Sequence, residues 1–156
     1  MRLGITGHQT LPPEVAAELK RTIRELAESE SIRLIASLAV GADQIAAEAV
    51  LGYGGQLEVV VPCDQYEATF TIGESLQTYQ RLLAHAAQVS VLPFPSPTEP
   101  AFMAAGILVV DRCDRLLAAW DGEPARGLGG TADVVRYARR EHKPIINVWP
   151  SGVRRQ

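Results

Sequence analysis

The chain has 156 residues, of which 47% are hydrophobic and 21% are charged. This balance predicts a single ordered domain over residues 1–156 and excludes a disordered or low-complexity protein. The 15 Lys and Arg residues against 18 Asp and Glu residues give a formal net charge of -3. Because no global positive field surrounds such a chain, we expect a nucleic acid to be an unlikely partner.

The cysteines and histidines give no sign of a disulfide or a metal site. Cys63 and Cys113 form no CxxC pair, and His8, His85 and His142 lack the spacing of metal ligands. We therefore expect no metal and no resident cofactor. The amino terminus enters an apolar run without a charged segment ahead of it, and no apolar run is long enough to span a membrane. These features predict a cytoplasmic protein with no membrane partner.

Short β-rich runs alternate with helical patterns along the chain. Strands are expected at Arg2 to Thr6, Ile32 to Ser37, Leu57 to Val61, Val89 to Phe94, Arg115 to Trp120 and Pro144 to Trp149. Five helices are expected between them, after Pro12-Pro13, after Gly41-Ala42-Asp43, from Leu76 to Ala86, from Phe102 to Cys113 and from Val134 to Ala138. Most strands are apolar throughout, as buried parallel strands are. The pattern predicts an α/β fold: a doubly wound, Rossmann-like parallel sheet of about six strands with helices on both faces.

The fourth expected helix is more apolar than one sheet face requires. Its sequence "AFMAAGILVV" carries Phe102, Met103, Ile107 and Val110. Such a helix is either fully buried or packed partly against another subunit. A homo-oligomer is therefore one of two outcomes that this segment predicts.

In open sheets of this kind, ligands bind outside the carboxyl ends of the strands. The first loop there contains Gly7, which could bring the backbone near a ligand, and His8, which could donate to a phosphate or a base or simply be solvated. The second loop runs from Ser37 through Gly41 to Asp43. Asp43 either caps the following helix or meets a ribose hydroxyl. We predict that these five residues contact the ligand.

Three acids in the later loops are candidates for chemistry. Asp64 follows the third strand, close to Tyr66 and Phe70, which could form a stacking wall or belong to the core. Asp121 and Glu123 follow the fifth strand. If the protein is an enzyme, we expect one of these three carboxylates to act as its acid or base.

The stretch from Asp121 to Arg140, "DGEPARGLGGTADVVRYARR", places Gly127, Gly129, Gly130 and Thr131 directly before an amphipathic helix. Glycines allow close approach to a ligand, and the first turn of a helix offers free N–H groups and the positive end of a dipole to an anion. The pattern predicts a bound phosphate. The alternative is a tight strand-to-helix connection with Thr131 as the N-cap.

Two common nucleotide motifs are missing. GxxxxGK[ST] does not occur, which removes the main support for an ordinary ATPase. GxGxxG is absent after the first strand, where only Gly4 and Gly7 occur, and no acid ends the second strand to hold a ribose. These absences speak against a standard NAD dehydrogenase.

The glycine-containing first loop, "GAD" before the second helix, "PCDQYEATF" after the third strand and above all Asp111 to Pro144 together resemble the SLOG superfamily. That group includes the LOG-type phosphoribohydrolases and the Smf/DprA-type DNA-processing proteins. The resemblance covers essentially the whole chain. It implies a modified Rossmann fold that binds nucleotides or nucleotide-derived, phosphoribosyl-containing ligands, with phosphate near Gly129, Gly130 and Thr131.

The chain departs from these relatives at one position that matters for catalysis. LOG-type enzymes carry a PGGxGTxxE pattern whose glutamate is catalytic, and the corresponding residue here is Val134. Asp133 lies one residue earlier, rotated by about 100° around the helix, so it cannot simply replace that glutamate. We therefore expect ligand binding, as in a sensor. The alternative is an N-glycosidic hydrolase or transferase that uses Asp64, Asp121 or Glu123.

Overall fold

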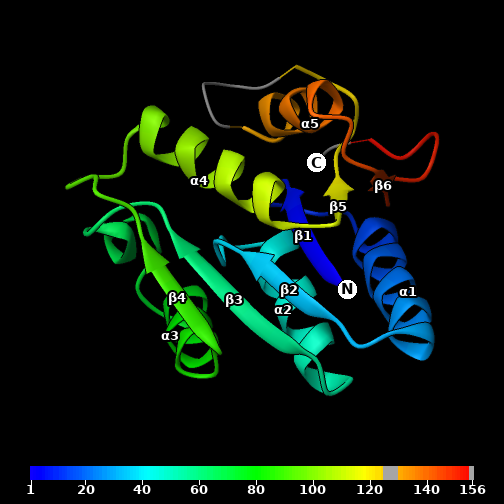
Figure 1. Ribbon diagram of the computed structural model, residues 1–156, viewed down its shortest axis with the longest axis horizontal. Coiled ribbons are helices and arrows are strands. Elements are labelled where there is room, and N and C mark those ends of the chain that lie inside the picture. The colour runs from blue at the N-terminus through cyan, green and yellow to red at the C-terminus, as the bar shows by residue number, and fades with distance from the viewer. Residues whose placement is uncertain (125–129, 155–156) are drawn as a thin grey trace.

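The computed structural model describes residues 1–124 and 130–154. Within these residues, six parallel strands form one sheet in the order β4-β3-β2-β1-β5-β6 (Figure 1). The strands are β1 (Arg2–Gly7), β2 (Arg33–Ala36), β3 (Gln56–Val61), β4 (Gln88–Val91), β5 (Arg115–Ala119) and β6 (Ile145–Asn147). This arrangement confirms the predicted α/β fold with a Rossmann-like parallel sheet.

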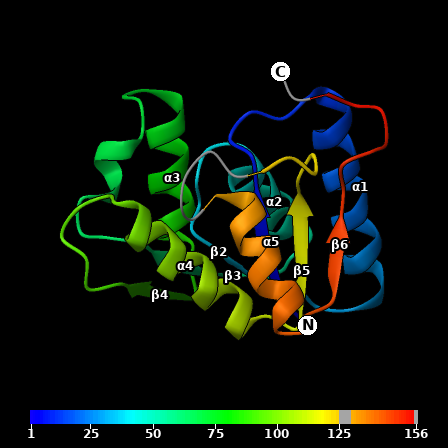
Figure 2. The same cartoon turned by 90° about the horizontal axis from the view of Figure 1, so that it is seen from above.

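Helices cover both faces of the sheet, as predicted. On one face lie α1 (Pro13–Ser29), α2 (Ala42–Gly52) and α3 (Glu74–Ala84), and on the other lie α4 (Glu99–Arg112) and α5 (Thr131–Arg140), which cross in front of the strands in Figure 2. A short 3-10 helix, η1 (Tyr66–Thr69), precedes α3. Within the described ranges, no helix is both long enough and apolar enough to cross a membrane.

Each face of the sheet has its own hydrophobic core. Leu57 and Val59 of β3 pack into the core beneath α1, α2 and α3. Ile35 of β2 and Val60 of β3 pack into the core beneath α4 and α5. Because successive side chains of a strand point to opposite faces, covering both faces requires apolar residues at every position. This is why these strands read as continuous apolar runs.

Two strands end earlier than the sequence predicts. β4 ends at Val91 rather than Phe94, because the N–H of Phe94 turns back to the carbonyl of Leu92 at 2.9 Å instead of continuing the ladder. β6 ends at Asn147 rather than Trp149. There the side-chain Oδ1 of Asn147 accepts a hydrogen bond from the N–H of Trp149 at 3.1 Å. This local bond holds the backbone in a turn instead of an extended strand.

The strand order reverses between β1 and β5. From β1 the chain adds β2, β3 and β4 in one direction, and α4 then returns it to place β5 on the other side of β1. The N–H of His8 bonds to the carbonyl of Ala119 at 3.3 Å, so the two strand ends are joined where they diverge. In folds of this class, the crevice outside such a reversal is the usual ligand site.

The apolar side chains of α4 are buried or partly buried within the chain. Val110 is buried, and Phe102, Met103 and Ile107 are partly buried. The most exposed large apolar side chains of the described residues lie elsewhere, at Val40, Tyr53, Ile72, Val89 and Val91. The helix is thus neither fully buried nor openly exposed, so its packing against another subunit stays a prediction.

Candidate functional site

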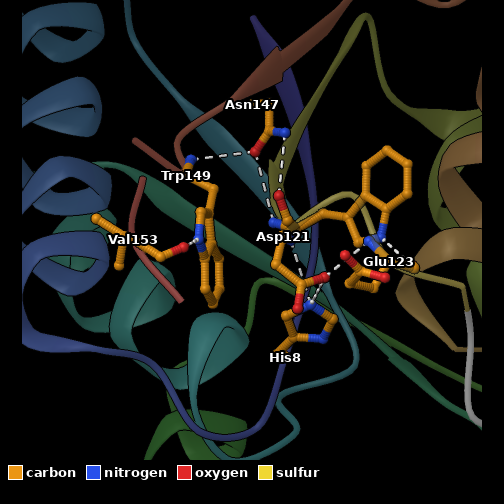
Figure 3. A network of polar contacts seen from close by, with 7 residues as sticks. His8, Asp121, Glu123, Asn147, Trp149 and Val153 are labelled. Atoms are coloured by element: carbon orange, nitrogen blue, oxygen red, sulfur yellow. Dashed lines mark hydrogen bonds and ion pairs between the residues drawn. The ribbon is translucent and has the colours of Figure 1, made fainter. Parts of the chain in front are cut away.

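A histidine and an aspartate meet at the carboxyl ends of β1 and β5. The Nε2 atom of His8 lies 3.2 Å from Oδ1 of Asp121, and the two side chains are 14% and 6% exposed (Figure 3). The same Asp121 oxygen accepts the backbone N–H of Glu123 at 3.0 Å. The carboxylate is thus held by both its own loop and the loop after β1. This contact brings together two residues that the sequence places in separate parts of the predicted site.

Two tryptophans and an asparagine flank this pair, and the sequence analysis did not find them. The ring of Trp149 meets that of His8 edge to face, with 5.4 Å between centroids. Asn147 donates to the carbonyl of Trp120 at 3.1 Å and accepts from Trp149 (Figure 3). The guanidinium of Arg139 lies 5.5 Å from the centre of the Trp120 ring. Their place in the sequence could have revealed them, because Trp120 and Trp149 lie just beyond the carboxyl ends of β5 and β6.

Two glycines of the predicted site make room for the chain itself. A Cβ atom on Gly7 would lie 2.4 Å from Cβ of Ala42 and 2.8 Å from Cβ of Ala119. Gly41 has a φ of 92°, and a Cβ atom there would lie 2.3 Å from the carbonyl oxygen of Gln9. These close approaches pack the loop after β1 against the start of α2. They explain both glycines without a ligand.

Asp43 is buried and faces its own loop. Its Oδ2 atom accepts the N–H of Ala39 at 3.4 Å, and its side chain lies within the first turn of α2. Gly41 is the N-cap of that helix, so Asp43 does not cap it. Burial raises the pKa of Asp43 to about 7, against the opposing effect of the Ala39, Ser37 and Leu38 backbone N–H groups. Asp43 therefore holds the loop that begins at Ser37.

This carboxyl group makes stability depend on pH. In the unfolded chain its pKa is about 4, so between about pH 4 and pH 7 only the folded state keeps the proton. The folded state is therefore favoured below pH 4, and this advantage is lost as the pH rises to 7. The total change is on the order of 4 kcal/mol. We therefore expect the free energy of unfolding, measured with urea, to fall between pH 4 and pH 7 in the parent relative to that of Asp43→Asn. A difference that is constant with pH would contradict the assignment.

The first turn of α5 opens toward the same edge. Gly130 is its N-cap, with φ and ψ of -71° and 172°, and its carbonyl accepts the N–H groups of Asp133 and Val134 at 3.1 and 3.2 Å. Thr131 is buried and is the first helical residue, so it is not the N-cap. Thr131 and Ala132 precede this bonded pair, and N–H groups at those first positions of a helix have no partner of the helix's own and can bind an anion. Gly127 and Gly129, which belong to the same prediction, lie outside the described residues.

Val134 faces α4 rather than the edge of the sheet. It is 3% exposed, and a Cβ atom on Gly106 would lie 2.6 Å from its Cγ2 atom. The glycine thus lets α5 come close to α4 at this point. The residue that replaces the glutamate of the LOG-type motif is therefore part of the packing between two helices.

The three candidate acids do not form one group. Asp121 and Glu123 share a loop, and Glu123 is exposed. Asp64 follows β3, where its N–H bonds to the carbonyl of Phe94 at 3.0 Å. Since β2 and β1 lie between β3 and β5, the two strands are about 14 Å apart. Tyr66 and Phe70, which follow Asp64, are buried against one another in the core and do not form an exposed wall.

Two further features of the described residues bear on other kinds of site. No group of three or more His, Cys, Asp and Glu side chains in this part of the chain is arranged to hold a metal ion.

A cavity of about 300 Å³ lies at the opposite edge of the sheet, lined by residues 27–32 at the end of α1 and residues 53–55 after α2. This edge carries the amino ends of the strands, where folds of this class do not place their ligands.

No protein-family model matches the chain, and no curated protein matches it by sequence. Solved structures do match. DNA processing protein A from Helicobacter pylori, which has a described single-stranded DNA binding mode, matches with a TM-score of 0.68 and 20% identity over 94% of this chain and 64% of that one. DNA processing protein A from Streptococcus pneumoniae matches with a TM-score of 0.71 and 19% identity over 94% and 49%. The chain thus spans less than two thirds of either protein.

The molybdenum cofactor binding protein from Rippkaea orientalis is a third match. Its TM-score is 0.63, with 17% identity over 94% of this chain and 74% of that one. The molybdenum cofactor carrier protein from Chlamydomonas reinhardtii matches with a TM-score of 0.60 and 15% identity over the same shares. At these identities the similarity establishes the fold.

The prediction that a nucleic acid is an unlikely partner is wrong. The chain shares its fold with DNA processing proteins, one of which has a described single-stranded DNA binding mode. The prediction used net charge, which sums over the whole surface and says nothing of local sites, whereas backbone N–H groups can hold phosphate without any cationic side chain. The chain has the Rossmann-like fold that DNA processing protein A and the molybdenum cofactor carrier proteins share.

Proposed function

We propose that this protein binds a nucleotide or a nucleotide-derived, phosphoribosyl-containing molecule at the carboxyl edge of its sheet. The observation that carries this proposal is the meeting of His8 and Asp121 at the point where the strand order reverses, on the edge toward which α5 begins. A crevice at such a reversal is where ligands of doubly wound sheets bind. Polar groups that converge there are the expected means of orienting a ligand.

Each part of the ligand has a matching group at this edge. The phosphate lies at the first turn of α5, where Gly130 has no side chain to block it and the helix dipole favours negative charge. Gly127 and Gly129 lie outside the described residues, and we assign them, with Thr131, to the same phosphate-binding segment on the sequence pattern alone. His8 and Asp121 form the wall beside it, and the Asp121 carboxylate accepts a ribose hydroxyl. Asp43 is committed to its own loop, so we assign the ribose contact to Asp121 in its place.

The ligands of the structural neighbours agree with this chemistry. A molybdenum cofactor and single-stranded DNA are the ligands named for them, and both ligands carry phosphate. The proposal is one of binding without turnover, as in a sensor, because the glutamate position of the LOG-type enzymes holds Val134. In such a sensor, ligand binding changes the stability of the protein or its contacts with other molecules, and this change is the signal.

We expect Gly130→Val to lose ligand while keeping its fold. The backbone angles of Gly130 are open to valine, but the branched side chain fills the space through which phosphate approaches the N–H groups. Thermal shift with AMP, ADP-ribose, NAD, cyclic nucleotides and phosphoribosyl compounds identifies the ligand of the parent, since binding raises apparent stability. Affinity of the variant for that ligand should fall by about tenfold or more.

Gly52→Val is the matched control. Gly52 lies at the end of α2, and a Cβ atom there meets nothing within 4 Å. This variant makes the same chemical change at the opposite edge of the sheet and should bind as the parent does. Equal affinity of Gly130→Val and Gly52→Val would refute the phosphate assignment.

A further inference from the structure

Trp120 offers a large aromatic side chain at the carboxyl edge of the sheet. The chain has two tryptophans, and both follow the carboxyl end of a strand, Trp120 after β5 and Trp149 after β6. Trp149 packs against the core beneath α1, α2 and α3 and against the ring of His8. Among the described residues, Trp120 packs against neither core, and it is partly exposed. An indole ring outside the core offers a ligand a large, flat apolar surface.

Neighbouring groups fix the position of the Trp120 ring. Its indole N–H donates to the carbonyl of Glu123 at 2.8 Å, and its backbone N–H donates to Oδ1 of Asn147 at 3.5 Å. The backbone carbonyl of Trp120 accepts a bond from the Asn147 side chain at 3.1 Å (Figure 3). From α5, the guanidinium of Arg139 lies over the ring, 5.5 Å from its centre. A ring that is held before binding loses little conformational freedom when a ligand stacks on it.

Trp120 is adjacent to Asp121 and lies on the face of the sheet that carries α5. Ala119 packs beneath α1, α2 and α3, so strand alternation turns the next side chain toward α5, and the contact with Arg139 agrees. The first turn of α5 is the position proposed for the phosphate, and Asp121 is the contact proposed for the ribose. In a nucleotide the base is bonded to that same ribose, so the base falls beside Asp121.

We propose that the ligand carries a planar base and that this base stacks on the ring of Trp120, on the side away from Arg139. The inference rests on the proposed function and narrows it, because a sugar phosphate without a base can fill the ribose and phosphate positions but not this one. Every nucleobase has a π-face, so stacking on an aromatic ring tolerates all of them. Trp120 therefore selects for the presence of a base and leaves its identity to other contacts.

The affinities of matched compounds test this role. AMP, GMP, CMP and UMP each carry a base, and ribose 5-phosphate is the same kind of molecule without one. In calorimetric titrations of the full chain, we expect the tightest of the four nucleotides to bind at least about tenfold more tightly than ribose 5-phosphate, which is the order of gain that one stacked base provides. Trp120→Leu should remove this advantage by weakening the binding of the nucleotides alone.

Two further variants separate stacking from a structural role. Trp120→Phe keeps an aromatic ring and should regain most of the advantage that Trp120→Leu loses. Tyr53→Leu is the control, because Tyr53 is 52% exposed and follows α2 at the opposite edge of the sheet, so this variant should bind all five compounds as the parent does. Circular dichroism verifies the fold of each variant.

Tryptophan fluorescence reports the stacking directly. The nucleotide that binds most tightly should quench the emission of the parent but not that of Trp120→Phe, in which Trp149 is the remaining tryptophan. The inference is overturned, and the phosphate position still stands, if ribose 5-phosphate binds the parent as tightly as the nucleotides do or if Trp120→Leu weakens both in equal proportion. If none of the five compounds and no member of the thermal-shift panel binds the parent, the proposed function and this inference fail together.

Discussion

Gly41→Val should lower the free energy of unfolding by about 3–5 kcal/mol. Two costs combine at this position. The φ of 92° is one that side chains rarely adopt, and a Cβ atom would lie 2.3 Å from the carbonyl oxygen of Gln9 and 2.6 Å from that of His8. Both neighbours are backbone atoms, which cannot move aside as the end of a flexible side chain can. A loss of this size is a large part of the stability of an ordinary domain.

Urea unfolding measures this loss, and Gly130→Val is the matched comparison. The same substitution at Gly130 meets ordinary backbone angles and should cost little. The pair of variants thus separates a glycine that the fold requires from one that we assign to the ligand. If Gly41→Val unfolds within about 1 kcal/mol of the parent, the close approach of the two loops is not what holds α2 in place.

Val134→Glu should destabilise the protein by about 3 kcal/mol or more and restore no catalysis. Val134 is 3% exposed and packs where α5 meets Gly106 of α4. A carboxylate placed there is buried against an apolar helix rather than aimed at a ligand. Arg136→Glu is the control, since the side chain of Arg136 is 71% exposed on the same helix and accepts a new carboxylate in solvent. Urea unfolding of both variants gives the comparison.

Val134 also predicts that the parent protein does not cleave nucleotides. Cleavage of an N-glycosidic bond passes through a cation-like sugar that a carboxylate must stabilise, and valine cannot do so. Loss of that group lowers turnover on the order of a thousandfold or more. Chromatography of AMP, CMP and deoxynucleosides after long incubation should therefore show no free base. If base is released and Asp121→Asn or Glu123→Gln stops it, the chain is an enzyme with a substitute carboxylate.

The sequence predicted the sheet because the information for it is local. Continuous apolar runs such as Leu57 to Val61 require cover on both faces, and the alternation with helices then fixes parallel strands and right-handed crossovers. Boundaries were less accurate where one local hydrogen bond decides, as the bond from Phe94 to Leu92 does after β4 and the bond from Trp149 to Asn147 does after β6. Neither effect is visible in hydrophobic periodicity.

The candidate site was predictable in position but not in detail. The edge rule placed His8 and Asp121 on the same side of the sheet, yet their contact and the packing of Trp149 on His8 depend on loops far apart in the chain. The sequence could not tell whether a glycine makes room for a ligand or for the chain itself. A missing Cβ atom suits a ligand and a neighbouring loop equally well, and only the structure reveals the Gln9 carbonyl beside Gly41.

Amide chemical shifts in NMR test the central claim most directly. The protein is titrated with the compound from the thermal-shift panel that stabilises it most. The account predicts that the largest changes occur at Gly130, Thr131 and Ala132 in the first turn of α5 and at Gly7 and His8 after β1. Changes concentrated instead in residues 27–32 and 53–55, which line the cavity at the opposite edge, would contradict it.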